Sequence, residues 1–379
     1  MMSSVISFTR VSRLAYRLGL AVVAFGSLPF AATHAISIDW VNVGDAGNAA
    51  DSNTFGDVSA AFRMMKYEFT NQQFVDFLNS VATVSDPYAL YAPVAQGGDP
   101  RCGVTRSGAA GSYVYSVKAN MGDKPVNAVS SFDAARVCNW LHNGATGTSS
   151  TETGAYTLNG QTTGTFPQPN PGATYTVPTE DQWYKTAYYK GGGTSAGYWA
   201  YSPQSDNIPG TVTSSTIGVG SKPLGTGDFA NFASTAIWNS QTGNVTTVGT
   251  NGGPSAYGAF DMTGNLWEWT SGTGASGAVL VTRGAAWDST QNPNPMSSTY
   301  SRQNHATGDQ VNTLGFRLVS VPEPSTYALT AICTLAMGGL MARRRQTSEG
   351  GPRVGAARAP GAGLAGQRRH GCRSAVSIE

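Results

Sequence analysis

Glycine is the residue that most restricts what this chain can fold into. It supplies 47 of the 379 residues, about 12% against a usual ~7%. Because glycine weakens helix and strand interiors and favours turns, we expect short elements joined by long loops. The eight Trp, 16 Tyr and 14 Phe are enough to build a hydrophobic core. With only 12% of its residues charged, the chain is not a disordered polyelectrolyte.

The charge is distributed unevenly along the chain. The first 35 residues hold three Arg and no acidic residue, and from Arg343 onward eight Arg stand against two Glu. Residues 36–320 carry 13 basic and 19 acidic side chains, which gives this part a net charge of −6. A nucleic-acid-binding protein needs a basic face. We therefore expect no nucleic acid among the partners.

Residues 1–35 have the parts of a secretory signal peptide. Three Arg precede an apolar run over residues 18–30, and small residues follow at Thr33 and Ala35. This order predicts export and cleavage by signal peptidase after Ala35. A transmembrane anchor is the alternative, but it needs about 20 apolar residues, and this run is shorter. The expected location is the periplasm, the cell envelope or the outside of the cell.

The C-terminal end has three parts in order: V-P-E-P-S-T at 321–326, an apolar stretch at 327–342, and three Arg at 343–345. Together they resemble the PEP-CTERM sorting signal of Gram-negative bacteria, which an exosortase recognises and processes. The resemblance implies that residues 321–346 anchor the protein in the inner membrane before processing, with the Arg cluster on the cytoplasmic side. A plain membrane anchor is the alternative. Residues 347–379, rich in Gly, Ala, Pro and Arg, are expected to be disordered.

Residues 36–320 contain no internal repeat or long linker and are expected to form one domain. Three short helices are predicted from capping residues followed by apolar residues at helical spacing. The caps are Thr70 with Gln73, Ser130, and Thr179 with Gln182. Short strands are predicted over 113–115, 175–177, 278–282 and 316–319. This pattern predicts a loop-rich α+β domain with little regular secondary structure.

Two cysteines, Cys102 and Cys138, lie in this domain, while Cys333 and Cys372 lie beyond it. In an oxidising compartment the first two could form a disulfide. Cys138, however, falls on the apolar face of a predicted helix, where a small buried thiol is equally well explained. The sequence leaves both readings open.

Five motifs follow one another between residues 67 and 317. They are Y-E-F-T-N-Q-Q-F at 67–74, P-V-N-A-V-S at 125–130 with D-A-A at 133–135, Y-T-V-P-T-E-D-Q-W at 175–183, Y-G-A-F-D-M-T-G-N-L-W-E-W-T at 257–270, and R-G at 283–284 with L-G-F-R at 314–317. In this order they resemble the formylglycine-generating enzyme (sulfatase-modifying factor) family. The resemblance implies a fold related to C-type lectin-like domains. Trp183, Trp267 and Trp269 are expected to be core residues.

The family places a structural calcium ion in the motif at 257–270. By resemblance, its ligands here are the side chains of Asp261 and Glu268 and the main-chain carbonyls of Gly264 and Leu266. Ca²⁺ takes six to eight oxygen ligands, and these groups supply several of them. The alternative is that both acids only accept backbone hydrogen bonds.

A second calcium site of the family is matched less completely. The resemblance implies Asn231 and Phe232 there, but no acidic partner is recognisable in this sequence. Calcium is therefore expected as a structural cofactor mainly at the first site.

The founding enzymes oxidise a substrate cysteine to formylglycine with O₂ and hold copper through two cysteines. Counted from Arg283, the corresponding places are Ser289 and Asn294, and no cysteine occurs anywhere in residues 139–332. Because Cu(I) is selected by soft thiolate ligands, no copper is expected and no catalytic residue can be assigned.

Related members hold iron through three imidazoles. Residues 36–320 contain only His142 and His305, so one chain cannot supply a three-histidine centre. A catalytic order of Ser, His and Asp is also not recognisable.

Two functions of different class follow. The first is a noncatalytic exported domain that binds a glycan or protein ligand through its loops, since loops carry recognition while a core stays fixed. The second is a metal-dependent oxidoreductase of the same family whose site the motifs do not reveal. Fold alone does not decide between them. Metal content does: calcium alone favours binding, whereas stoichiometric iron or copper favours an enzyme.

Overall fold

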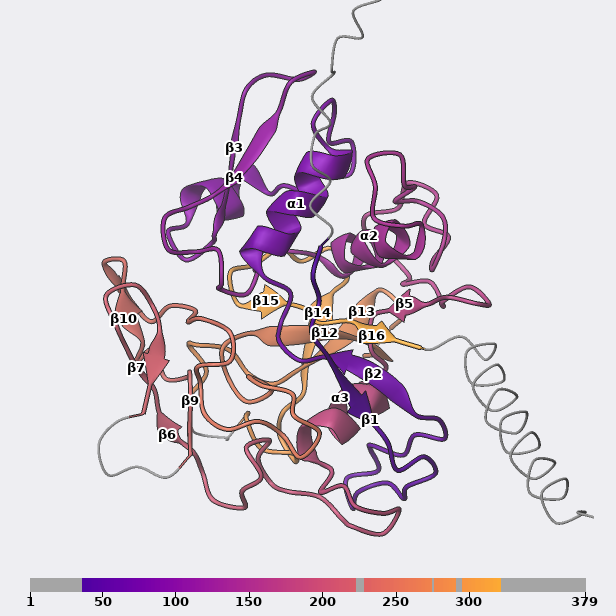
Figure 1. The fold of residues 1–379 in the computed structure, drawn as a ribbon, viewed down its shortest axis with the longest axis vertical. Coiled ribbons are helices and arrows are strands. Elements are labelled where there is room, and N and C mark those ends of the chain that lie inside the picture. Colours follow the sequence, from indigo (N-terminus) through magenta and orange to yellow (C-terminus); the bar gives the residue numbers. More distant parts are fainter. Residues whose placement is uncertain (1–35, 223–227, 275, 291–294, 322–379) are drawn as a thin grey trace, which may run out of the picture. The chain divides into compact units, whose positions relative to one another are not determined.

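The computed structural model describes residues 36–222, 228–274, 276–290 and 295–321 (Figure 1). The predicted signal peptide, the sorting tail after Val321 and the C-terminal stretch lie outside these ranges. In the part of the chain that is described, no helix combines the length and the apolar character needed to cross a membrane.

Three α-helices form behind the predicted capping residues. They are α1 (Asn71–Val81), α2 (Ser131–His142) and α3 (Glu180–Tyr188). At each start, the cap side chain accepts the backbone N–H three residues on, and that residue's side chain accepts the cap's own N–H. Two orphan donors are thereby satisfied at each helix start. A π-helical turn, Pro93–Gly97, has no counterpart among the sequence predictions.

The first four-stranded sheet joins the two ends of the domain. Its strands, in spatial order, are β1 (Trp40–Val43), β2 (Phe62–Met65), β16 (Val319–Ser320) and β5 (Tyr175–Thr176), and all neighbours are antiparallel. Val319 pairs with Met64 on one side and with Thr176 on the other. The last strand of the body is thus held between β2, from its beginning, and β5, from the middle of the chain.

The second four-stranded sheet carries the longest family motif. Its spatial order is β14 (Gln303–Ala306), β13 (Val279–Arg283), β12 (Trp267–Thr273) and β15 (Leu314–Gly315). β15 runs parallel to β12, and the other pairs are antiparallel. Glu268 lies on the central strand β12, opposite Arg283 on one side and Gly315 on the other.

The remaining strands form two-stranded pieces. They are β3 (Val104–Ser107) with β4 (Val114–Val117), β6 (Gly210–Thr211) with β9 (Phe229–Ala230), β7 (Thr213–Ser214) with β8 (Gly220–Ser221), and β10 (Ile237–Trp238) with β11 (Gln241–Thr242). The strands predicted at 113–115, 175–177 and 278–282 overlap β4, β5 and β13. The strand predicted at 316–319 is wrong in its centre, because Leu314–Gly315 and Val319–Ser320 belong to different sheets. The loop-rich α+β prediction is confirmed.

The core is aromatic, as predicted. Trp183 and Trp269 are fully buried, and Trp267 is nearly so. The largest hydrophobic cluster contains residues of α1, α2 and β12, and within it the rings of Phe69 and Phe316 stack with centroids 4.9 Å apart. Trp183 belongs to a smaller cluster with residues of α3 and Met262. The motif at 257–270 therefore contributes to both clusters.

Candidate functional site

The loop before β12 turns through the left-handed region of backbone space. Asp261, Gly264 and Asn265 all have positive φ, of 58°, 84° and 69°. At Gly264 a Cβ would lie 2.4 Å from the carbonyl oxygen of Asn231, so only glycine fits there. This close approach brings the loop against Asn231 and directs its polar side chains into the interior.

Glu268 is held by a buried ion pair. Both of its carboxylate oxygens accept from the Arg317 guanidinium, each at 2.6 Å. Trp183 adds a third donor through its indole N–H at 2.8 Å. Glu268 and Arg317 are completely buried, so this pair is a charge-assisted, bidentate contact shielded from water.

Glu68 lies in the same interior. It belongs to the motif at 67–74, and the sequence suggested no separate role for it. Its Oε2 accepts from the side-chain amide of Asn265 at 2.8 Å, while its Oε1 is buried and has no hydrogen-bond partner. Burial, followed by the neighbouring carboxylates of Asp261 and Glu268, raises the pKa of Glu68 well above its usual value. The sequence signal that could have identified Glu68 is an acidic residue placed between the apolar residues Met65 and Phe69.

Asp261 is also buried and carries neutral partners. It accepts from the main-chain N–H of Gly249 and, at 3.0 Å, from the side-chain amide of Asn251. Burial raises the pKa of Asp261, and the two hydrogen bonds oppose this shift. Among the described residues, each of its two oxygens accepts one hydrogen bond, and neither is bonded to a cationic side chain.

Asn231 connects this cluster to the next loop. Its amide donates to the carbonyl of Asn244 at 2.8 Å and to Oδ1 of Asn265 at 3.0 Å, while its own Oδ1 is buried without a partner. Phe232 is fully buried beside it. The structure thus brings the weaker calcium candidates next to the loop at 261–268.

The fit to calcium is partial. Among the described residues no group of three or more His, Cys, Asp or Glu side chains is placed to hold a metal ion, so main-chain and amide oxygens would have to complete any site. Glu268 has three of its lone-pair positions filled and its charge balanced by Arg317. Free oxygen capacity lies instead at Asp261, Asn231 and Glu68.

The suggested disulfide is not formed. Cys102 and Cys138 are both free and fully buried. Cys138 lies on α2 in the main hydrophobic cluster, which agrees with the alternative of a small buried side chain. Burial raises the pKa of the Cys102 thiol to about 12, and it raises that of Cys138 further. Both are therefore thiols at neutral pH.

Ser289, where the resemblance implies the first copper-binding cysteine, closes a turn. The hydroxyl of Ser289 accepts the N–H of Ala286 at 2.9 Å, and its own N–H donates to the carbonyl of Ala286 at 3.0 Å. Its carbonyl accepts from Ala233 at 2.9 Å. Asn294, at the second position, lies outside the described residues.

Glu180, at the start of α3, forms a second ion-paired group. It accepts from Arg283 at 2.5 Å and from Arg302 at 2.9 Å. Gln182 carries out the capping. The Glu180–Arg283 contact ties the start of α3 to β13.

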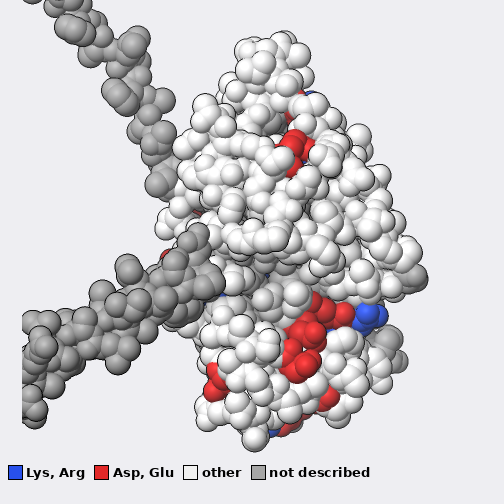
Figure 2. Space-filling model, turned by 90° about the vertical axis from the view of Figure 1, so that its right-hand side faces the viewer, with Lys and Arg blue, Asp and Glu red and all other residues white. Residues whose placement is uncertain are grey.

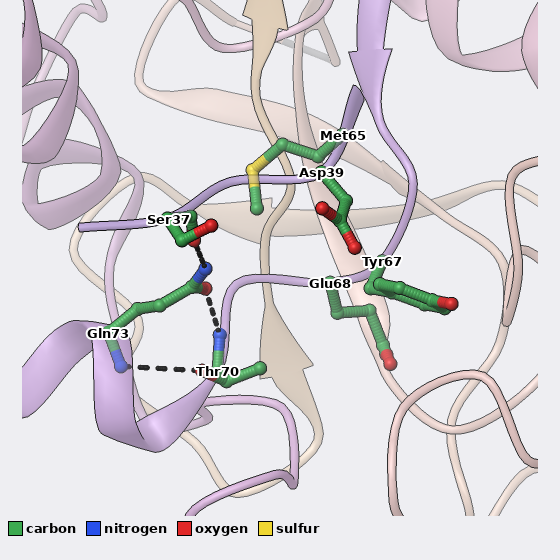
Figure 3. Close-up of a pocket in the computed structure, with 7 residues that line it drawn as sticks. All are labelled: Ser37, Asp39, Met65, Tyr67, Glu68, Thr70 and Gln73. Carbon is green, nitrogen blue, oxygen red and sulfur yellow. Dashed lines mark hydrogen bonds between the residues drawn. The ribbon is translucent and has the colours of Figure 1, made fainter. Parts of the chain in front are cut away.

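Two hollows open on the surface. One of about 100 Å³ has Glu68 in its wall, and Figure 3 shows this side chain extending away from Ser37 and Gln73. Its lining residues are Ser37, Asp39, Met65, Tyr67, Glu68, Thr70 and Gln73. The other, of about 310 Å³, lies at the start of α3 between Asp57 and Asp181. Figure 2 shows acidic side chains gathered on one face of the body.

Two four-stranded sheets, three capped helices and a buried polar loop define a loop-rich α+β domain. The family model described as sulfatase-modifying factor enzyme 1-like domain matches residues 40–321. The chain belongs to this family, as the motifs predicted.

No curated protein matches the chain. Among solved structures, CarF is 22% identical with a TM-score of 0.47, covering 75% of this chain and 98% of that one. Treponema denticola variable protein 1 is 17% identical with a TM-score of 0.48, covering 76% and 97%. PvdO from Pseudomonas aeruginosa is 18% identical with a TM-score of 0.40, covering 75% and 92%.

Proposed function

We propose that this protein is an exported cell-envelope binding module: a sulfatase-modifying factor-like domain that is noncatalytic, stabilised by calcium, and directed to a glycan or protein ligand. Export would depend on signal peptidase cleavage after Ala35 and on exosortase processing of residues 321–346. Until that processing, the C-terminal segment would hold the protein in the inner membrane.

The noncatalytic part rests on one observation: the body offers no accessible thiol that could bind copper. Ser289 stands where the family chemistry requires a copper-binding cysteine, and its hydroxyl is used to close a turn. The two cysteines of the body, Cys102 and Cys138, are buried and protonated. Copper needs accessible thiolates, so neither cysteine can substitute for the missing pair.

The binding part is supported by where the polar surface lies. Long loops between short strands cover much of the body, and the hollow of about 310 Å³ is lined by loop residues and by the start of α3. Loops on a fixed core are the usual carriers of recognition. The hydrophobic clusters beneath them provide that fixed core.

Three measurements test the proposal on the purified protein. A glycan array with and without calcium should find ligand binding. Metal analysis should find calcium and no stoichiometric iron or copper. A cysteine-containing sulfatase peptide should remain unoxidised with or without added copper. Copper- or iron-dependent turnover of the peptide would instead favour an oxidoreductase of the same family.

The export part is tested separately. N-terminal sequencing of the mature protein should begin at Ile36, and cell fractionation should find it in the envelope or outside the cell. A mature protein that retains residues 1–35 in the cytoplasm would contradict this part without affecting the binding proposal.

A further inference from the structure

The dipeptide Asn-Gly occurs three times in the chain, at 143–144, 159–160 and 251–252. Asparagine is among the thermolabile residues of proteins. In Asn-Gly the backbone nitrogen of the glycine can attack the side-chain carbonyl carbon of the asparagine, because glycine has no Cβ to obstruct the approach. The fold places the three pairs in different surroundings, so they should not react alike.

Two of the three asparagine side chains are held by hydrogen bonds. The side-chain amide of Asn143 donates to the carbonyls of Ser150 and Thr153, at 2.9 and 2.7 Å. Asn251 is 4% exposed, and its side chain makes two buried hydrogen bonds. Each of these side chains would have to break two hydrogen bonds before its carbonyl carbon could turn toward the next backbone nitrogen.

The side chain of Asn159 is not held in this way. Asn159 and Gly160 are both exposed, and the Asn159 side chain forms no hydrogen bond with the described part of the chain. The two residues are the centre of a turn that the Gln161 N–H closes by donating to the carbonyl of Leu158 at 3.0 Å. Both have positive φ, of 52° and 79°, as in a type I′ turn. The asparagine side chain therefore stands free at the tip of a turn.

The nitrogen of Gly160 has one restraint. Its N–H donates to Oε2 of Glu152 at 2.7 Å, and Glu152 in turn pairs with Arg136 of α2 at 2.7 Å. This nitrogen must leave Glu152 before it can attack, so the reaction should be slower in the folded protein than in an unfolded chain. A surface turn can open locally without global unfolding, and such an opening frees the nitrogen.

We propose that Asn159 is a self-modification site of this protein, at which the Gly160 nitrogen bonds to the side-chain carbonyl carbon of Asn159. The bond from that carbon to the side-chain nitrogen breaks, and ammonia leaves with the proton that the Gly160 nitrogen gives up. Water then opens the resulting succinimide to aspartate or to isoaspartate, so the reaction needs no oxidant or reductant. The proposal is independent of the proposed function.

The products weaken the contact that ties this turn to α2. The succinimide nitrogen carries no hydrogen, so Glu152 loses the donor that Gly160 supplies. Isoaspartate adds an atom to the backbone, which displaces the Gly160 nitrogen from Glu152. Aspartate and isoaspartate both add a carboxylate near that of Glu152, and like charges repel. We therefore expect modification to loosen the segment 144–172, which follows α2.

The test incubates the purified protein for several days in mildly alkaline buffer and measures conversion at each Asn-Gly pair by peptide mass mapping, with fragmentation to separate Asn143 from Asn159. In the folded protein, conversion at Asn159 should be at least about tenfold faster than at Asn143 or Asn251, since those side chains must first break two hydrogen bonds. In guanidinium the three pairs should react at similar rates, and Asn159 should react faster than in the folded protein.

Asn159→Gln is the matched control: it keeps a side-chain amide but would have to close a larger ring, so it should show little conversion at this pair. After the incubation, wild type should be cut within 144–172 by a nonspecific protease faster than fresh protein, and Asn159→Gln should not. Equal conversion at the three pairs in the folded protein would overturn the assignment, as would conversion at Asn159 that occurs only after denaturation. Incubated wild type that is no more sensitive to the protease than fresh protein would contradict the loosening of this segment.

Discussion

Removal of Arg317 provides the most direct test of how this core is held together. In Arg317→Met, Glu268 loses both guanidinium bonds, at 2.6 Å each, and keeps only the indole N–H of Trp183. The carbonyl of Phe260 loses its donor at 2.9 Å. The unpaired Glu268 then faces two further buried acids, Glu68 and Asp261.

Breaking a buried pair by removing one partner costs about 3–5 kcal/mol. At ~2–4 °C per kcal/mol for a domain of this size class, the melting temperature should fall by about 10 °C. Thermal unfolding followed by circular dichroism in chelator at pH 7 measures this shift. Arg302→Met is the matched control. Its partner Glu180 keeps Arg283, and its own side chain is 38% exposed, so the expected cost is at most about 1 kcal/mol.

The double variant Arg317→Met/Glu268→Met separates charge from packing. With both charges gone, the core loses its repulsion, although the Trp183 N–H loses its acceptor at a cost of about 1–3 kcal/mol. The double variant should therefore melt above Arg317→Met alone. A shift of less than about 2 °C in Arg317→Met, or a double variant that melts below it, would refute the electrostatic account.

Three further predictions concern groups outside this pair. Burial raises the pKa of Asp133 to about 6, above its unfolded value of about 3.9, so ionisation costs more in the folded state. The free energy of unfolding should therefore fall by up to about 3 kcal/mol as pH rises from about 4 to 6. Thermal melts across that range should show a weaker pH dependence in Asp133→Asn than in the wild type. An unchanged pH dependence in the variant would contradict the prediction. Cys102 and Cys138 should be unreactive toward a thiol reagent in the native protein and both react in guanidinium, whereas resistance after denaturation in the absence of reductant would indicate a disulfide. Ser130→Ala should cost about 0.5–2 kcal/mol in chemical denaturation through the lost α2 cap, and an equally stable variant would show that the cap does not hold that helix.

The sequence predicted the features that are encoded locally. A capping residue and its partner lie three positions apart, so the starts of α1, α2 and α3 could be placed from Thr70, Ser130 and Thr179. Strands were harder, because β12 is buried at four consecutive residues, from Trp267 to Thr270, and shows no alternation of buried and exposed side chains there. β12 lies between β13 and β15 in the sheet. Its burial follows from these neighbours and not from an alternation of polar and apolar residues in its own sequence.

Only those residues of the candidate site that lie close together in the sequence could be predicted. Asp261 and Glu268 stand in one motif, and both are in the buried cluster. Glu68 and Arg317 come from opposite ends of the body, 249 positions apart in the sequence, and no local pattern pairs either with the loop. Which acid receives the guanidinium is decided by tertiary packing, which no local sequence pattern encodes.

Under the noncatalytic proposal, the scaffold keeps its fold without the chemistry of the founding enzymes. Where a copper-binding cysteine would stand, Ser289 bonds to the backbone of Ala286 and receives the N–H of Ala233, so the turn is kept by hydrogen bonds. Arg283 is bound to Glu180 and Arg317 to Glu268, and both arginine side chains are buried. These pairs stabilise the domain whether or not a metal site is present. The loops above that core can then vary toward a ligand without loss of the fold.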